Sequence, residues 1–338
     1  MKNRSLFLPN KIIFIILVFL LFNFFSCQLF LPPGLSFPQP SSPSGKSGAA
    51  STLGVMTTYS GTGEYPYGIA YVGVNMWTAN YVWTATEISP AGVLTTSAVF
   101  GNEPIAIAYD ESGNMWVANI GNSTVSEINA SETLLQTCTL TAGSGPYGIA
   151  YDNNGNMWTA NYGNSSVTKI NTSTGAIVNT ITLTAGSSPS SIAYDNNGNM
   201  WTANYGNSSV TKINTSTGLI VNTYSLPAGS NPYGIAYDGA NMWTANYGNN
   251  SVTIITSSGG MTTYTGTGIN PNGIAYDGAN MWTANHAGNS VTRITPAGGM
   301  TTYSLPAGSS PFGIAYDNNG NMWTANYGNS SVTKISTK

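Results

Sequence analysis

Few side chains in this sequence combine the reactivity and the spacing that catalysis needs. The only histidine is His286, which directly follows Asn285. An imidazole can act as a general base near neutral pH, so His286 is a candidate catalytic residue. Segments similar to the one around His286 recur along the chain, and several of them carry a tyrosine at its position. Sequence drift therefore explains this histidine equally well. The sequence contains no Ser-His-Asp set, paired metal-ligand spacing or phosphate-binding glycine loop.

Acidic side chains recur at one place in these segments, but turn chemistry explains them. Six aspartates open short stretches of the form Asp-x-x-Gly-Asn or Asp-Gly-x-Asn: Asp110, Asp152, Asp195, Asp238, Asp277 and Asp317. Aspartate in such a turn accepts hydrogen bonds from nearby backbone N–H groups. We therefore predict a structural role for them and expect no cofactor, with a magnesium or calcium ion as the alternative.

Binding candidates follow a recurring proline. The next residue varies where the segments are otherwise nearly identical: Tyr67, Ile105, Tyr147, Ser190, Tyr233, Asn272 and Phe312. Aromatic faces beside amides suit a sugar or a small planar ligand. We predict ligand contacts at Tyr67, Tyr147, Tyr233, Asn272 and Phe312. Asn285 and His286 are expected to lie at the same end of the folded domain and to contact the ligand as well. Drift at an exposed position is the alternative.

A repeated strand pattern must position these residues. The motif Met-Trp-x-Ala-Asn recurs seven times at intervals of 39 to 43 residues, with its tryptophans at Trp77, Trp116, Trp158, Trp201, Trp243, Trp282 and Trp323. Trp83 lies outside the series. Periods of this length are typical of propeller blades or solenoid units. Short strands separated by Gly, Asn and Asp clusters indicate a four-stranded antiparallel meander in each unit.

The two ends of the repeat array predict a closed ring. The last unit has three strands and ends near Ile335, whereas an extra strand at residues 54–60 precedes the first unit. That strand closely matches the fourth strand at residues 299–304. The N-terminal strand is therefore expected to complete the last blade, which leaves no open end. We predict an all-β fold, a single seven-bladed β-propeller over residues 53–338.

The N-terminal residues resemble an export signal. Lys2, Arg4 and Lys11 precede an apolar run that ends in Phe24-Phe25-Ser26-Cys27. This ending resembles the lipobox of bacterial lipoproteins, which implies a signal peptide over residues 1–26 and a lipid on Cys27. Residues 27–52, rich in Pro, Ser and Gly, are then expected to tether the domain to a membrane. An ordinary signal peptide or an uncleaved anchor is the alternative.

Composition limits the partners. Only 6% of residues are charged and the formal net charge is −3, which becomes more negative if residues 1–26 are removed. Without a basic patch, nucleic acid is not an expected partner. Cys27 and Cys138 are the only cysteines, so no disulfide framework is expected, and Cys138 is interpreted as a small buried hydrophobe. We expect an exported, membrane-anchored monomer at the periplasmic face or on the outer cell surface.

The units resemble two related propeller groups. Residues 167–188, from Val-Thr-Lys-Ile to Ala-Gly-Ser-Ser, resemble the YVTN/NHL-type repeat of bacterial extracytoplasmic proteins. The Pro-x-Gly-Ile strand followed by a tryptophan strand is similar to the seven-bladed streptogramin (virginiamycin B) lyase. That resemblance implies elimination across an ester of a cyclic peptide, with a histidine base and a magnesium ion near carboxylates.

This sequence departs from the lyase pattern at the second-strand ends. Asparagine stands there in all seven units where the lyase pattern has glutamate: Asn80, Asn119, Asn161, Asn204, Asn246, Asn285 and Asn326. An amide brings no charge to a hard cation, so a magnesium site is weakened. We therefore expect a binding or scaffolding module for a protein or carbohydrate partner. A lyase- or lactonase-like enzyme that uses His286 and a divalent ion is the alternative.

Overall fold

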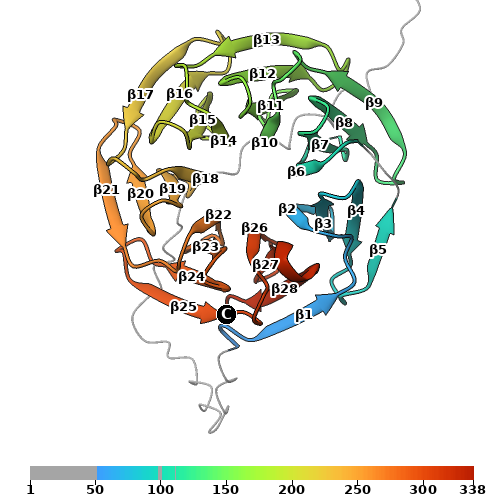
Figure 1. Ribbon diagram of the computed structural model, residues 1–338, viewed down its shortest axis with the longest axis vertical. Helices are drawn as coiled ribbons and strands as arrows, with labels where there is room; N and C mark the ends of the chain where they lie inside the picture. Colours follow the sequence, from blue (N-terminus) through green and yellow to red (C-terminus); the bar gives the residue numbers. More distant parts are fainter. Residues whose placement is uncertain (1–51, 98–100, 111) are drawn as a thin grey trace, which may run out of the picture. The chain divides into compact units, whose positions relative to one another are not determined.

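The computed structural model describes residues 52–97, 101–110 and 112–338. These residues form seven four-stranded antiparallel sheets arranged around a central axis (Figure 1). The predicted fold class is therefore confirmed. The predicted signal peptide, lipidated Cys27 and tether lie outside the described residues, apart from residue 52. In the described part of the chain, no helix has the length and apolar character needed to cross a membrane.

In the first six blades the strands run from the axis outward in sequence order. The first three blades contain β2 (Pro66–Val72), β3 (Asn75–Asn80), β4 (Thr84–Ile88), β5 (Leu94–Ser97), β6 (Pro104–Tyr109), β7 (Met115–Asn119), β8 (Thr124–Ile128), β9 (Leu134–Thr139), β10 (Pro146–Tyr151), β11 (Asn156–Asn161), β12 (Ser166–Asn171) and β13 (Ile177–Thr182). The next three contain β14 (Pro189–Tyr194), β15 (Asn199–Asn204), β16 (Ser209–Asn214), β17 (Ile220–Ser225), β18 (Pro232–Tyr237), β19 (Met242–Asn246), β20 (Ser251–Ile255), β21 (Met261–Thr265), β22 (Pro271–Tyr276), β23 (Met281–Asn285), β24 (Ser290–Ile294) and β25 (Met300–Ser304).

The seventh blade joins the two ends of the propeller. It contains β26 (Pro311–Tyr316), β27 (Asn321–Asn326), the 3₁₀ turn η1 (Tyr327–Asn329), β28 (Ser331–Ser336) and, as its outer strand, β1 (Met56–Ser60). Strand β1 pairs antiparallel with β28, from Met56 opposite Ile335 to Ser60 opposite Ser331. The predicted closure is therefore consistent with the structure, and the ring leaves no blade incomplete.

The core lies between neighbouring blades. Side chains alternate along a strand, so the Trp and Ala of each motif face one neighbouring blade and the Met faces the other. Trp158 and Ala160, for example, pack with Met200 and Ile213 of the next blade. Six of the seven motif tryptophans are at most 1% exposed. Burial of one such indole contributes on the order of 3 kcal/mol.

A hydrogen bond not foreseen from the sequence connects each aspartate turn to the motif tryptophan. In blade 3, Asp152 Oδ1 accepts from the backbone N–H groups of Asn154 and Asn156, which confirms the predicted turn role. Its Oδ2 accepts from the Trp158 indole at 3.0 Å. The same indole bond recurs in five other blades. These aspartates are therefore structural links between turn and core.

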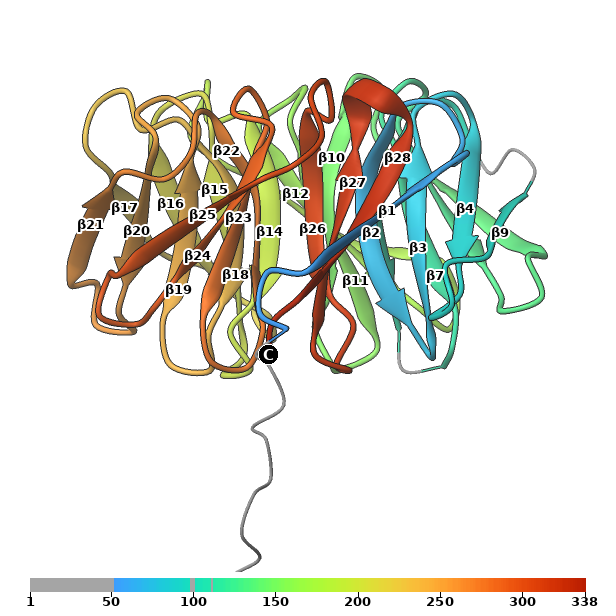
Figure 2. The same ribbon diagram turned by 90° about the horizontal axis from the view of Figure 1, so that it is seen from below.

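The first strands begin, and the second strands end, at the same end of the propeller, which we call the mouth. The turn η1 lies at this end, at the top of Figure 2, and the C-terminus lies at the opposite end. Every recurring proline and every motif asparagine is therefore at the mouth end of its blade.

Candidate functional site

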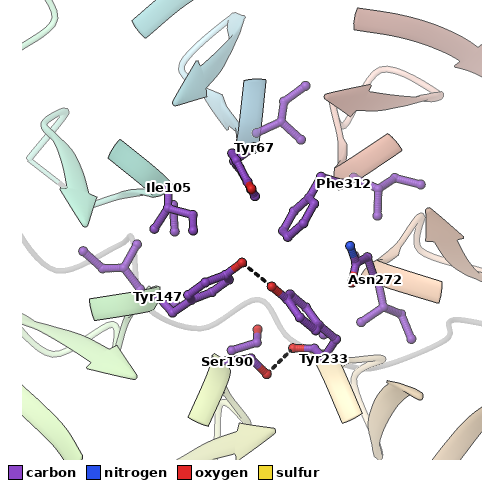
Figure 3. Close-up of a pocket in the computed structure, with 18 of the residues that line it drawn as sticks. Tyr67, Ile105, Tyr147, Ser190, Tyr233, Asn272 and Phe312 are labelled. Atoms are coloured by element: carbon purple, nitrogen blue, oxygen red, sulfur yellow. Dashed lines mark hydrogen bonds between the residues drawn. The ribbon is translucent and has the colours of Figure 1, made fainter. Parts of the chain in front are cut away.

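The residue after each proline leaves the strand ladder as a β-bulge. In blade 3, Pro146 is opposite Asn161 and Gly148 is opposite Ala160, so Tyr147 has no partner of its own. The same register shift occurs in the first strand of the other six blades. A bulge re-aims the side chain of the extra residue. The residue after the proline therefore faces the axis (Figure 3).

These seven side chains meet around one pocket on the axis. The pocket has a volume of about 170 Å³, and its lining includes Tyr67, Ile105, Tyr147, Ser190, Tyr233, Asn272 and Phe312. Figure 3 shows these residues converging from seven different blades. Of the predicted contacts, the structure thus brings Tyr67, Tyr147, Tyr233, Asn272 and Phe312 together. Their role in ligand binding stays a prediction.

Contacts among the lining residues fix the shape of the pocket. The Tyr233 hydroxyl donates to the Tyr147 hydroxyl, and Ser190 Oγ donates to the Tyr233 carbonyl at 2.9 Å. The Tyr67 and Phe312 rings meet edge to face, with centroids 4.3 Å apart. Burial raises the pKa of the Tyr67, Tyr147 and Tyr233 phenols, which therefore stay protonated at neutral pH.

Asn272 is the lining residue whose polar group lacks a partner. Its side chain is 2% exposed, and its Oδ1 is buried without a hydrogen-bond partner. A buried unpaired acceptor costs about 1–3 kcal/mol. Buried polar groups in folded proteins are nearly always bonded, to protein or to ordered water. A donor that reaches Asn272 would therefore gain a strong site-specific contact.

A second ring of side chains lies above the first. Its members directly follow the motif asparagines and are all half-buried: Tyr81, Ile120, Tyr162, Tyr205, Tyr247, His286 and Tyr327. The Tyr205 ring lies 5.6 Å from that of Tyr233, and the Tyr162 ring lies 5.6 Å from that of Tyr147. The mouth is therefore an aromatic funnel of two tiers. The sequence carried a signal for this outer ring, because the same position is aromatic in six units.

His286 belongs to the outer ring. Its ring centroid lies 6.0 Å from that of Phe312 and 6.3 Å from that of Tyr327. Burial lowers the pKa of His286, and no carboxylate contributes to the shift. The imidazole is thus neutral at pH 7. The structure places it at the predicted mouth but pairs it with aromatic rings rather than with an acid that would orient it.

Asn285 is placed differently from the other predicted contacts. Its side chain is fully buried, and its Nδ2 donates to Ser290 Oγ at 3.1 Å and to Thr292 Oγ1 at 3.0 Å. Its Oδ1 accepts from Thr283 Oγ1 at 2.9 Å. The amide therefore serves the interior of blade 6 and does not line the pocket. Its partners are all side-chain hydroxyls.

Comparison with protein families identifies the propeller. The model of the virginiamycin B lyase family matches residues 55–336, which is most of the chain. The chain belongs to the virginiamycin B lyase family. A comparison with curated proteins finds no match.

Solved structures agree with this family at the level of the fold. A streptogramin B lyase is 22% identical, with a TM-score of 0.77, and the match covers 84% of this chain and 97% of that one. A catalytically inactive histidine-to-alanine variant of the virginiamycin B lyase from Staphylococcus aureus, with quinupristin, is 21% identical with a TM-score of 0.76, over 83% and 99% of the two chains. Hydrazine synthase from Kuenenia stuttgartiensis is 18% identical with a TM-score of 0.72, over 81% and 96%.

The magnesium ion that the lyase resemblance implies does not fit the side chains at this mouth. The motif asparagines are fully buried and their amides bond to Ser and Thr hydroxyls. The outer ring offers phenols, one isoleucine and one imidazole in their place. Within residues 52–97, 101–110 and 112–338, no three His, Cys, Asp or Glu side chains are grouped closely enough to hold a metal. Hard cations prefer several charged oxygen ligands.

Proposed function

We propose that this member of the virginiamycin B lyase family is a binding module that takes a carbohydrate into its mouth without converting it. The single observation that carries the proposal is the Asn272 amide, whose buried Oδ1 lacks a partner at the wall of an aromatic pocket. A sugar hydroxyl supplies the missing donor once the amide turns its Oδ1, which is closed to solvent in this structure, toward the pocket. The aromatic faces around it supply apolar contact for the C–H face of the sugar ring.

The character of the lining supports a neutral ligand group. The pocket contains no Lys, Arg, Asp, Glu or His side chain among its lining residues. Its polar side-chain groups are the hydroxyls of Tyr67, Tyr147, Tyr233, Ser190 and Ser191, with the amide of Asn272. Binding sites for small molecules commonly combine an apolar, aromatic wall with a few polar groups that fix orientation. A volume of about 170 Å³ limits the inserted part to one ring-sized group.

A lyase- or lactonase-like reaction is the competing function, and His286 favours it. The lowered pKa of His286 leaves its imidazole free to accept a proton at neutral pH. This reaction lacks a carboxylate that would orient the base, since the ring neighbours of His286 are Phe312 and Tyr327. We therefore rank it second.

Calorimetric titration of the purified protein with a panel of neutral oligosaccharides tests the proposal, with mass analysis of the recovered ligand. We expect saturable binding of at least one saccharide and an unchanged ligand mass. Parallel incubations with cyclic depsipeptides and lactones address the second function. Turnover by the wild type that disappears in His286→Tyr, which carries the tyrosine found in five of the other six units, would show a catalytic function in place of binding without conversion. The absence of saturable binding across the panel would contradict a carbohydrate ligand.

A further inference from the structure

One sector of the mouth rim breaks the seven-fold pattern. Trp83 occupies the position just before the third strand, where the other six blades carry serine or asparagine: Ser123, Ser165, Ser208, Asn250, Asn289 and Ser330. The backbone φ is positive at all seven positions, and it is 58° at Trp83. Bulky L-residues rarely adopt this left-handed region, whereas asparagine tolerates it. Tryptophan is therefore an unfavourable choice for the fold at this position.

Trp83 also cannot form a hydrogen bond that connects neighbouring blades at the other junctions. At the other junctions a side-chain oxygen accepts from the backbone N–H of the residue before the next blade's proline, as Ser208 Oγ does from Asn231 at 3.1 Å. An indole has no acceptor to offer. The Trp83 Nε1 instead donates to Asn102 Oδ1 at 3.0 Å, which fixes the plane of the ring. The side chain stays 51% exposed, so burial does not compensate for these losses.

Two further departures occur in blades 1 and 2. The residue before the proline also has positive φ in every blade, and five blades use small or amide residues there: Gly145, Ser188, Asn231, Asn270 and Ser310. Tyr65 and Glu103 take this position in blades 1 and 2. The backbone N–H of Tyr81 donates to the Tyr65 carbonyl at 3.0 Å. Burial and a hydrogen bond to Glu103 raise the pKa of the Tyr81 phenol. We call Tyr65, Tyr81, Trp83 and Glu103 the rim sector.

The side chains around Glu103 are held close together. A Cβ placed on Gly121 would lie 2.9 Å from both Glu103 Oε2 and Asn102 Cγ. Asn102 is in turn the hydrogen-bond partner of the Trp83 indole. The carboxylate of Glu103 and the exposed indole of Trp83 therefore both lie near the side chain of Asn102.

The distribution of charged side chains indicates which sign of charge a ligand at the rim sector should carry. Glu64, next to Tyr65, and Glu103 bring negative charge to the mouth end of blades 1 and 2. The described basic residues lie elsewhere: Lys169, Lys212 and Lys334 over core tryptophans, Arg293 opposite Trp282, and Lys338 against the turn at Gly320. We propose that the rim sector binds an organic ammonium group, by cation–π contact with the Trp83 indole and ionic attraction to Glu103. This site goes beyond the proposed carbohydrate binding and does not depend on it.

Choline and its neutral isostere 3,3-dimethylbutan-1-ol test the proposal by NMR titration of the full chain. The Trp83 indole N–H signal is assigned as the one absent from Trp83→Ser, which carries the serine found at this position in four of the other six blades and is therefore expected to keep the fold. We expect choline to shift this signal saturably and the isostere at the same concentration to leave it unmoved. In Glu103→Gln, which keeps the shape of the side chain, the choline affinity should fall about fivefold.

Three results would overturn the proposal. These are no saturable shift of the Trp83 signal with choline, an equal shift with the isostere, or an unchanged affinity in Glu103→Gln. The variant Asn272→Leu separates this site from the pocket, because choline binding should persist in it even where oligosaccharide binding is lost. Loss of choline binding in Asn272→Leu would place the ammonium in the central pocket and contradict the rim sector.

Discussion

Asn119 differs from the other motif asparagines in the bonding of its amide oxygen. In six blades a threonine two residues earlier donates to the asparagine Oδ1, as Thr159 does to Asn161 at 2.9 Å. Val117 occupies that position in blade 2, and Asn119 Oδ1 is buried without a partner. One absent hydroxyl therefore leaves this network incomplete.

Restoring the hydroxyl should stabilise the protein. Val117→Thr replaces a side chain of nearly the same shape and supplies the donor, so we expect the free energy of unfolding to rise by about 1 kcal/mol. The matched reverse change, Thr159→Val, should lower it by about 1–3 kcal/mol because it creates a buried unpaired acceptor. Urea unfolding measures both. Equal stability of the two variants would show that these hydrogen bonds do not matter.

His286 gives the mouth a pH response of known sign. Its folded-state pKa lies below the ordinary value of 6.5, so protonation favours the unfolded chain. This contribution to stability is present above pH 6.5 and is lost as the pH falls through the folded-state pKa. Between pH 7.5 and pH 5.5 the thermal midpoint of the wild type should therefore fall more than that of His286→Tyr. Parallel curves for the two proteins would contradict a buried neutral imidazole.

At the scale of the strand, the outer strand of blade 7 comes from the opposite end of the propeller chain. Tyr59 of β1 stacks on Trp323, with ring centroids 5.7 Å apart, as Tyr224 of β17 stacks on Trp201 at 5.5 Å. The first pair is distant in sequence and the second is local. Equal packing in the two places means that β1 is a full member of its blade.

If β1 closes the ring by packing on β28, two tyrosine substitutions should lower the free energy of unfolding equally. Tyr59→Ala and Tyr224→Ala each remove a ring from the face of a buried tryptophan, so each should lower the free energy of unfolding by about 2 kcal/mol. Chemical denaturation of the two variants makes the comparison. If Tyr59→Ala were silent while Tyr224→Ala was costly, β1 would not be docked on β28.

Strand-level features differed in how far the sequence could predict them. Repetition of Met-Trp-x-Ala-Asn and the match of residues 54–60 to residues 299–304 were enough to predict seven blades and their closure. The bond from Asp152 to the Trp158 indole was not foreseen, because it joins side chains across a turn and depends on their rotamers. The bulge at Tyr147 was missed because a register shift leaves no mark on composition.

In the molecule as a whole, the seven-fold arrangement brings the equivalent residues of the seven units together in a ring around the axis. Variation after the recurring proline predicted the inner lining, because side chains at equivalent positions must meet at the axis (Figure 3). Asn285 lies in the blade interior rather than at the predicted mouth lining, since strand ends alone do not say whether a side chain faces the axis or the blade interior. The outer ring of tyrosines followed the same logic but carried little variation to draw attention to it.

At one position of the inner lining, the residue that suits binding is not the residue that suits stability. Asn272 has a buried, unpaired Oδ1 in the pocket wall, so the fold gains no hydrogen bond from this oxygen. Stability and function often conflict where a binding site keeps such a group. If a ligand supplies the missing donor, replacement by an apolar side chain should improve the fold and harm binding together.

The central pocket as a carbohydrate site is tested most directly by two measurements on Asn272→Leu, the free energy of unfolding and the free energy of oligosaccharide binding. We predict that the free energy of unfolding stays level or rises by about 1 kcal/mol, while the saccharide affinity falls tenfold or more. Asn222→Leu, an exposed amide on β17, is the matched control and should leave the affinity unchanged. An Asn272→Leu protein that binds the saccharide as tightly as the wild type would contradict the central pocket as the binding site.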